Sequence, residues 1–231
     1  MKLRAVLLDA TGVLIDPAEP VGQTYSEFAS RHGIRLPAWR LEDAFRRALR
    51  GAPARVLPGA TGQPAIDFER GWWRERVRQT FQAADSTVHF EDFDVFFSEI
   101  YDHFSRGEAW RLRAGAVEAL TALRGRPVRT GLVSNFDHRL PGVLEELGIT
   151  TLLDVVMLPS ICGAAKPDPA IFLAALALIG AEAGETVYVG HDPVLDAMAA
   201  SRAGLLPLLL DAAEKLDTLP TRIEQIANLG R

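Results

Sequence analysis

The stretch LLDATGVLID, residues 7–16, decides how the rest of the chain is interpreted. An apolar run that starts at Ala5 ends in a carboxylate at Asp9 and then enters a turn at Gly12. In an open α/β sheet, ligands bind at the carboxyl ends of the strands. The stretch therefore predicts a buried strand that delivers Asp9 to a site at its tip, with a threonine, Thr11, two residues further on.

Four more apolar segments alternate with helical patterns from about residue 109 onward. Apolar strands that alternate with helices are typical of a mostly parallel sheet covered on both faces. We therefore expect an α/β protein with a Rossmann-like core, and the strand before Asp9 belongs to the same sheet. The other expected strands are VRTGLVSN (128–135), LDVVML (153–158), TVYVG (186–190) and LLPLLLD (205–211).

Residues 16–108 have a different pattern. Four segments there place apolar residues three or four positions apart, as an amphipathic helix does. The sequence thus predicts a helical cap at 16–108, inserted into a core made of residues 1–15 and 109–231.

The composition fits a globular protein of 231 residues, with 48% hydrophobic and 24% charged residues. A net charge of −5 argues against a general nucleic-acid or membrane surface. The one cysteine, Cys162, excludes an intramolecular disulfide and a cysteine zinc cluster. Residues 1–8 are too short for a signal peptide, and no apolar run approaches the roughly 18 residues of a membrane span. We expect a soluble cytoplasmic protein and leave a homodimer open.

Polar side chains follow the expected strands where each one ends. Besides Asp9, they are Ser134 and Asn135 after the second strand, Lys166 in a loop after the third, and an acidic segment after the fourth. A carboxylate, a hydroxyl, an ammonium and a further acid at one sheet edge suit a phosphate group and a magnesium ion. Taken singly, each has a structural alternative: a capping acid, a serine that closes a turn, or a solvated lysine.

The acidic segment HDPVLD, residues 191–196, offers two carboxylates and one imidazole. We favour Asp192 as the magnesium ligand and expect Asp196 to hold Lys166 or a metal-bound water. Asp196 could instead serve only the dipole of its helix. His191 is the less favoured ligand because magnesium prefers oxygen.

The order and spacing of these residues resemble the haloacid dehalogenase (HAD) superfamily. The motifs LLDATGVLID, LVSNFDHRL, GAAKPDPAIF and VGHDPVLDAMAASRAGLLPLLL carry the resemblance. Within the superfamily, the chain resembles the haloacid dehalogenase-like hydrolase domain-containing protein 3 subfamily. The features that carry this resemblance are the motif SNFDHRL, the D-x-T-G start and the Trp72–Trp73 pair. The inserted helical block is similar to the cap of subclass I.

The resemblance implies a hydrolase that acts on a small phosphorylated metabolite through an aspartyl-phosphate. Asp9 would be the nucleophile, and Ser134 and Lys166 would be the other catalytic residues. The phosphate-binding residues would be Ser134, Asn135 and Lys166.

The resemblance also implies magnesium as the cofactor. The carboxylate of Asp9, the backbone carbonyl of Thr11 and the carboxylate of Asp192 would hold the ion, and Asp196 would support it.

Thr11 departs from the pattern of the superfamily's phosphatases. In those phosphatases, an aspartate at this position protonates the leaving alcohol. This sequence departs a second time at Val13, where the D-x-D-G-T pattern has a threonine. A hydroxyl does not titrate near neutral pH, so Thr11 cannot act as a general acid or base. General acid–base catalysis typically raises a reaction rate by about 10²–10⁴-fold. Thr11 indicates either a leaving group that departs without protonation or a slow or reassigned phosphatase.

Two other functions stay open on the sequence alone. A 2-haloacid dehalogenase would use Asp9 to attack carbon without a metal, although the retained acid Asp192 and the D-x-T-G start speak against it. A non-catalytic binding protein built on a decayed enzyme would explain Thr11 and His191. No P-loop or G-x-G-x-x-G motif supports a nucleotide cofactor.

Overall fold

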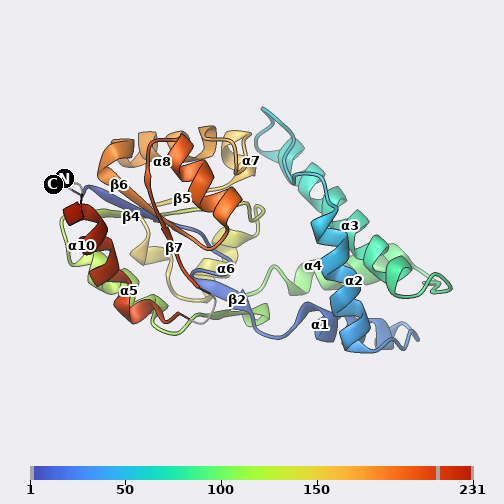
Figure 1. Ribbon diagram of the computed structural model, residues 1–231. Helices are drawn as coiled ribbons and strands as arrows, with labels where there is room; N and C mark the ends of the chain where they lie inside the picture. The colour runs from blue at the N-terminus through green and yellow to red at the C-terminus, as the bar shows by residue number, and fades with distance from the viewer. Residues whose placement is uncertain (1–2, 212–213, 230–231) are drawn as a thin grey trace.

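The computed structural model describes residues 3–211 and 214–229. Two lobes lie side by side: a parallel sheet with helices on both faces, and a lobe built of helices α1 to α4 (Figure 1). Among the described residues, no helix combines the length and the apolar composition that crossing a bilayer requires.

Five parallel strands form the sheet, in the order β5-β4-β1-β6-β7. The sheet confirms the predicted α/β class with a mostly parallel sheet. β1 lies in the middle, between β4 and β6, so the strand that precedes Asp9 is the centre of the lobe. The strands are β1 (Ala5–Leu8), β4 (Arg129–Val133), β5 (Val155–Met157), β6 (Thr186–Gly190) and β7 (Leu206–Leu209).

Both faces of the sheet are buried, which is why its strands are apolar throughout. Val6 and Leu8 pack against α5, α6 and α10 on one face, whereas Leu7 packs against α8 and α9 on the other. The helices of this lobe are α5 (Ala116–Arg124), α6 (Leu140–Glu146), α7 (Pro159–Cys162), α8 (Ala170–Ile179), α9 (Ala199–Arg202) and α10 (Leu219–Leu229).

The helical lobe has a hydrophobic core of its own, rich in aromatic rings. Phe81 packs edge-on against Phe96 and Phe90 and stacks with Tyr25, and all but Phe90 are fully buried. The cap limits at 16 and 108 remain predictions. The helices are α1 (Val21–Arg31), α2 (Ala38–Arg50), α3 (Gln63–Ala84) and α4 (Phe93–His103).

A short antiparallel pair lies where the chain passes between the lobes. β2 (Ile15–Pro17) pairs with β3 (Trp110–Leu112), and Asp16 lies opposite Arg111. No sequence pattern predicts this pair, because three residues are too few to show a strand periodicity.

The helix expected after β6 is split. Its first part is a π-helix, η4 (Pro193–Met198), and its second part is α9. Short 3₁₀ turns connect other elements: η1 (Gly107–Ala109), η2 (Thr150–Leu152), η3 (Ala183–Glu185) and η5 (Leu216–Thr218).

Helix α1 depends on its neighbour α2 at its first turn. Pro20 provides no side-chain cap, and the N–H of Gly22 donates instead to Glu42 of α2 at 2.8 Å. A Cβ on Gly22 would lie 2.3 Å from the carbonyl oxygen of Ala38 and 2.4 Å from the backbone nitrogen of Glu42. The close contact of these two helices therefore requires glycine.

We expect Gly22→Ala to destabilise the protein by about 2 kcal/mol or more, because two backbones must separate. Gly71→Ala is the matched control, since Gly71 is also helical and a Cβ there meets nothing within 4 Å. The control should be neutral or stabilising by up to about 1 kcal/mol. Urea denaturation of both variants measures the difference, and equal stabilities would contradict the packing described here.

Candidate active site

The carboxyl ends of the three central strands carry polar residues that the sequence singled out. The predicted site residues Asp9 and Ser134 follow β1 and β4, and His191, the less favoured metal ligand, follows β6. Because β4 and β6 both pair with β1, these three ends lie next to one another. Asp9 and Ser134 are buried, whereas the side chain of His191 is 44% exposed.

Lys166 joins the two acids of the site. Its Nζ lies 3.0 Å from Oδ2 of Asp9 and 2.6 Å from Oδ1 of Asp196, and its side chain is only 2% exposed. Oδ1 of Asp9 also accepts a hydrogen bond from the N–H of Ala10 at 2.8 Å. The structure thus brings Asp9, Lys166 and Asp196 together, and Lys166 is one of the two partners expected for Asp196.

Tyr188 is a site residue that the sequence analysis missed. Its hydroxyl accepts from Lys166 Nζ at 2.9 Å and lies 3.0 Å from the carbonyl oxygen of Val133 and 3.1 Å from Asp196. Burial, reinforced by the charges of Asp9 and Asp196, raises the pKa of Tyr188 well above its ordinary value. The phenol therefore stays neutral and holds the ammonium in place. In the sequence, the tyrosine of VYVG (187–190) is its only signal, since the other residues of this stretch are valines and a glycine.

Asp196 is held as an ionised carboxylate. Its Oδ2 accepts from the backbone N–H groups of His191 at 2.8 Å and Asp192 at 2.9 Å. Burial alone would raise the pKa of Asp196, but the Lys166 ammonium and these hydrogen bonds hold it below its usual range. A Cβ on Gly190 would lie 2.3 Å from Cβ of Asp196, so glycine is what lets the strand end approach this side chain.

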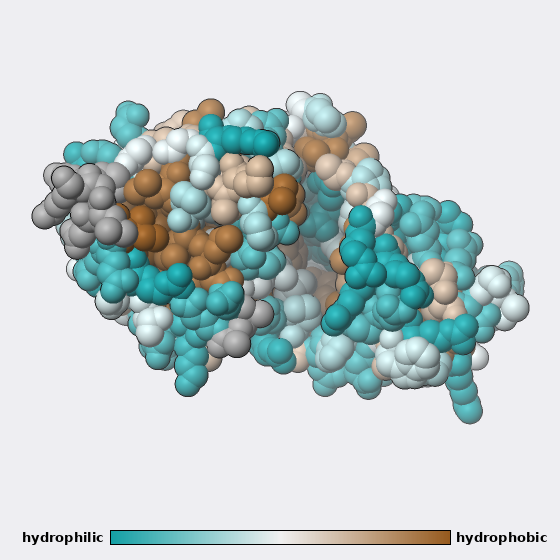
Figure 2. Space-filling view, in the orientation of Figure 1, coloured by the Kyte–Doolittle hydropathy of each residue, from teal (hydrophilic) through white to brown (hydrophobic). Residues whose placement is uncertain are grey.

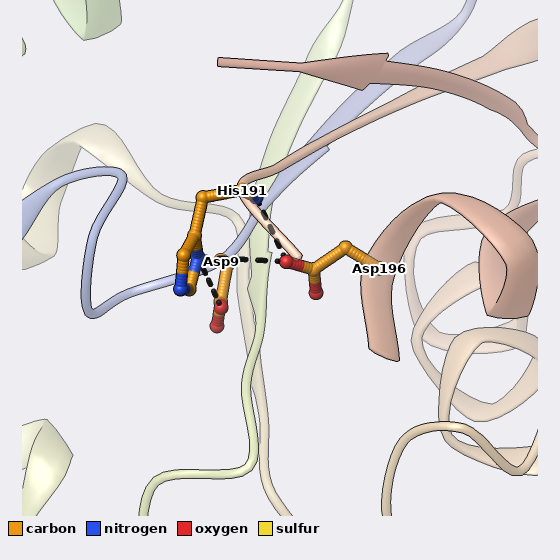
Figure 3. A group of neighbouring side chains, drawn as sticks. All are labelled: Asp9, His191 and Asp196. Atoms are coloured by element: carbon orange, nitrogen blue, oxygen red, sulfur yellow. Dashed lines mark hydrogen bonds and ion pairs between the residues drawn. The ribbon is translucent and has the colours of Figure 1, made fainter. Parts of the chain in front are cut away.

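Asp9, His191 and Asp196 form the group that could hold a metal ion (Figure 3). Each offers a ligand atom, and these atoms lie within 4.8 Å of one another. Nδ1 of His191 is 3.6 Å from Asp9 and 3.5 Å from Asp196. The donors fit a divalent cation, although the imidazole makes the set less than ideal for magnesium, which prefers oxygen.

Asp192 is not part of this group in the structure. Its Oδ1 accepts from the N–H groups of Val194 at 2.8 Å and Leu195 at 2.8 Å, so its carboxylate caps η4. The assignment of Asp192 as a magnesium ligand, together with the Thr11 carbonyl, therefore stays a prediction.

Asn135 ties the loop after β4 to the backbone of Lys166. Its Oδ1 accepts from the Lys166 N–H at 2.7 Å, and its Nδ2 donates to the Lys166 carbonyl at 2.8 Å. Oγ of Ser134 lies 3.2 Å from the N–H of Phe136, within its own turn. Asn135 thus positions Lys166, and the phosphate contacts of Ser134 and Asn135 remain predictions.

The same loop holds the helical lobe through a buried ion pair. Asp137, which is fully buried, pairs with Arg139 at 2.7 Å and accepts from Trp73 Nε1 of α3 at 2.6 Å. Arg139 also donates to the carbonyl of Tyr101 in α4 at 2.9 Å. Burial alone would raise the pKa of Asp137, but the Arg139 guanidinium beside it holds that pKa well below the usual range. In the sequence, Asp137 and Arg139 stand out only as part of the motif SNFDHRL, and the motif does not predict these contacts.

Between the lobes lies a cavity of about 220 Å³. Its walls come from α1 to α4, from β3 and from the loop after β4, and Thr11 forms part of them. Figure 2 shows the cleft that separates the two lobes on one face of the molecule. The cavity therefore adjoins the turn that follows Asp9.

We expect Asp137→Asn to destabilise the protein by about 3 kcal/mol at pH 7, because it leaves Arg139 charged and buried. The pKa of Asp137 is lowered by folding, so its stabilising charge is fully present above the ordinary aspartate pKa of about 3.9 and is lost as the pH falls below it. The difference in the free energy of unfolding between wild type and Asp137→Asn should therefore become smaller below pH 4. Urea denaturation from pH 3 to pH 7 measures it.

The control is Asp43→Asn, which breaks an exposed pair with Arg47 on α2 and should cost less than about 0.5 kcal/mol. A difference for Asp137→Asn no larger than that of the control would contradict this account.

Comparison with known proteins identifies the family. The family model described as haloacid dehalogenase-like hydrolase matches residues 3–204. Haloacid dehalogenase-like hydrolase domain-containing protein 3 of Xenopus laevis is 33% identical over 213 residues, which cover 91% of this chain and 85% of that protein.

Solved structures share the fold at lower identity. A HAD phosphatase from Thermococcus onnurineus matches with a TM-score of 0.64 at 19% identity, over 96% of this chain and 98% of that one. The magnesium-bound structure of YfnB from Bacillus subtilis matches with a TM-score of 0.70 at 14% identity, over 98% and 100% of the two chains. With the family model matching most of its length, this chain belongs to the haloacid dehalogenase-like hydrolases.

Proposed function

We propose that this hydrolase is a phosphatase of a small phosphorylated metabolite and that it acts through an aspartyl-phosphate at Asp9. The observation that carries the proposal is the buried carboxylate of Asp9 at the tip of the central strand, 3.0 Å from the Lys166 ammonium. A phosphate dianion that approaches Asp9 meets this ammonium at once. The similarity in fold to a HAD phosphatase supports the same reaction class.

In the proposed reaction, Asp9 attacks phosphorus in line with the leaving oxygen. Lys166 orients Asp9 and offsets negative charge on the phosphate oxygens, while Asp196 and Tyr188 fix the position of Lys166. The Ser134 hydroxyl, at the neighbouring strand end, donates to a phosphate oxygen. Water then hydrolyses the aspartyl-phosphate and restores the carboxylate.

Magnesium is the proposed cofactor, and the YfnB structure that shares this fold is magnesium-bound. The residues proposed to hold the ion are Asp9 and the Thr11 carbonyl, with a third ligand from the segment 191–196. When bound, the cation offsets phosphate charge beyond what Lys166 supplies. Asp192 is the proposed third ligand, and Asp196 and His191, which cluster with Asp9, are the alternatives to it.

We expect Asp9→Asn to lower phosphate release from acetyl phosphate and 4-nitrophenyl phosphate by about 10³-fold or more, because the nucleophile is lost. Removal of magnesium with a chelator should also abolish turnover by wild type. Phosphate release with and without magnesium measures both effects.

Asp43→Asn, an exposed aspartate on α2, is the control and should keep wild-type activity. Wild type that releases no phosphate from any ester, but releases halide from 2-haloacids without metal, would instead establish the dehalogenase alternative.

Thr11→Asp should restore the missing acid. We expect it to raise turnover of an alkyl phosphate by about 10-fold or more and to leave acetyl phosphate nearly unchanged, because only the alkyl leaving group needs a proton. Thr11→Asn has a similar shape without a titratable proton and should give no gain. A gain with both variants, or with neither, would show that Thr11 does not limit the leaving group.

A further inference from the structure

The turn that follows Asp9 leaves one of its backbone carbonyl groups unpaired. The Ala10 carbonyl accepts hydrogen bonds from N–H groups later in the same turn, the shortest at 2.8 Å. The Gly12 carbonyl accepts a hydrogen bond from the guanidinium of Arg113. Within residues 3–211 and 214–229, no donor reaches the Thr11 carbonyl that lies between them. A carbonyl oxygen of this kind is free to act as a ligand of a divalent cation.

Glycine at position 12 makes the direction of this carbonyl hard to fix locally. Gly12 has a φ of +79°, and glycine rotates about its backbone bonds more freely than other residues do. The peptide group that joins Thr11 to Gly12 is restrained on one side, where the Gly12 N–H donates to the Ile15 carbonyl at 3.0 Å. On the other side, Arg113 holds the Gly12 carbonyl. The direction of the Thr11 carbonyl therefore depends on Arg113.

Arg113 reaches the turn from the strand that brings the chain back from the helical lobe. It directly follows β3, and its own N–H donates to the Leu14 carbonyl at 2.9 Å, next to the β2–β3 pair. The side chain of Arg113 is only 7% exposed. A guanidinium buried to this extent needs acceptors around it.

The guanidinium of Arg113 holds three segments together. Besides the Gly12 carbonyl, it bonds the carbonyls of Glu214 at 3.0 Å and Asp211 at 3.4 Å, which belong to the segment after β7. Its Nε lies 3.8 Å from the carboxylate of Asp16 in β2. The planar fork of an arginine bonds several acceptors in fixed directions, whereas a lysine ammonium acts as a point charge. The turn that contains Gly12 is thus anchored both to the strand pair between the lobes and to the chain beyond the sheet.

We propose that Arg113 is a positioning residue of the active site. By holding the Gly12 carbonyl, it fixes the direction of the Thr11 carbonyl and so strengthens the binding of a divalent cation at Asp9 and Thr11. The proposal rests on the function proposed above and adds the residue that prepares the cation site. In this role Arg113 touches neither the substrate nor the cation and acts through the turn alone.

The test measures Mg²⁺ binding by isothermal titration calorimetry, with Arg113→Gln and Arg113→Lys as variants. Both should bind Mg²⁺ at least about 10-fold more weakly than wild type, since loss of a residue that orients a metal ligand typically costs about 10- to 100-fold in affinity. Excess Mg²⁺ should restore most of the lost turnover of acetyl phosphate, which would not happen if Arg113 only stabilised the fold.

Arg111→Gln is the matched control. Arg111 lies two residues earlier in β3, its side chain is exposed, and it donates to the Ala18 carbonyl at 3.0 Å. This variant should bind Mg²⁺ as wild type does. Urea denaturation of all three variants separates a loss of Mg²⁺ binding from a loss of stability.

The outcomes separate the two proposals. Unchanged Mg²⁺ binding in folded Arg113→Gln and Arg113→Lys, or no Mg²⁺ binding by wild type, would overturn the positioning role, and turnover of acetyl phosphate by wild type would leave the phosphatase intact. Weaker Mg²⁺ binding in both variants, with no turnover of any phosphate by wild type, would support the positioning role and overturn the phosphatase. Because Arg113→Lys keeps the buried charge, it also covers a failure of Arg113→Gln to fold.

Discussion

The buried Lys166 ammonium, held between Asp9 and Asp196, is the interaction on which the rest of the site depends. Burying one ammonium and two carboxylates is unfavourable unless each finds its partners, and removal of one leaves the others uncompensated. The fold supplies those partners from three separate elements: Asp9 from the end of β1, Asp196 from η4, and the Tyr188 hydroxyl from β6. The site therefore depends on the order of the strands, which places β1 beside β6.

A single loop serves both lobes. Residues 134–139 follow β4, whose neighbour β1 ends at Asp9, and Asn135 fixes the backbone of Lys166. A few residues later, Asp137 and Arg139 bind Trp73 and the backbone of Tyr101 in the helical lobe. The shape of the cavity and the position of the ammonium therefore both depend on this one segment.

How much of this structure the sequence predicts depends on how far apart in the sequence the contacting residues lie. The pattern predicts Asp9 because an apolar strand ends in this residue and strand ends of a parallel sheet meet at one edge. Lys166 lies in a loop well after its strand, and the family motif GAAKPDPAIF is what predicts its role. For Asp196, a contact with Lys166 was one of two expected roles, whereas the spacing of the segment does not show that the carboxylate of Asp192 caps η4. The contacts of Trp73 and Arg55 join residues 64 and 80 positions apart, and no local pattern encodes such pairs.

The central claim, that Asp9 is the nucleophile, is tested most directly by quenching the reaction with acetyl phosphate in acid and mapping the phosphoryl group on the peptides of the protein by mass spectrometry. This account predicts a phosphoryl group on the peptide that contains Asp9, and none in Asp9→Asn. Steady turnover with no trapped phosphoprotein, or a phosphoryl group on any other residue, would contradict it.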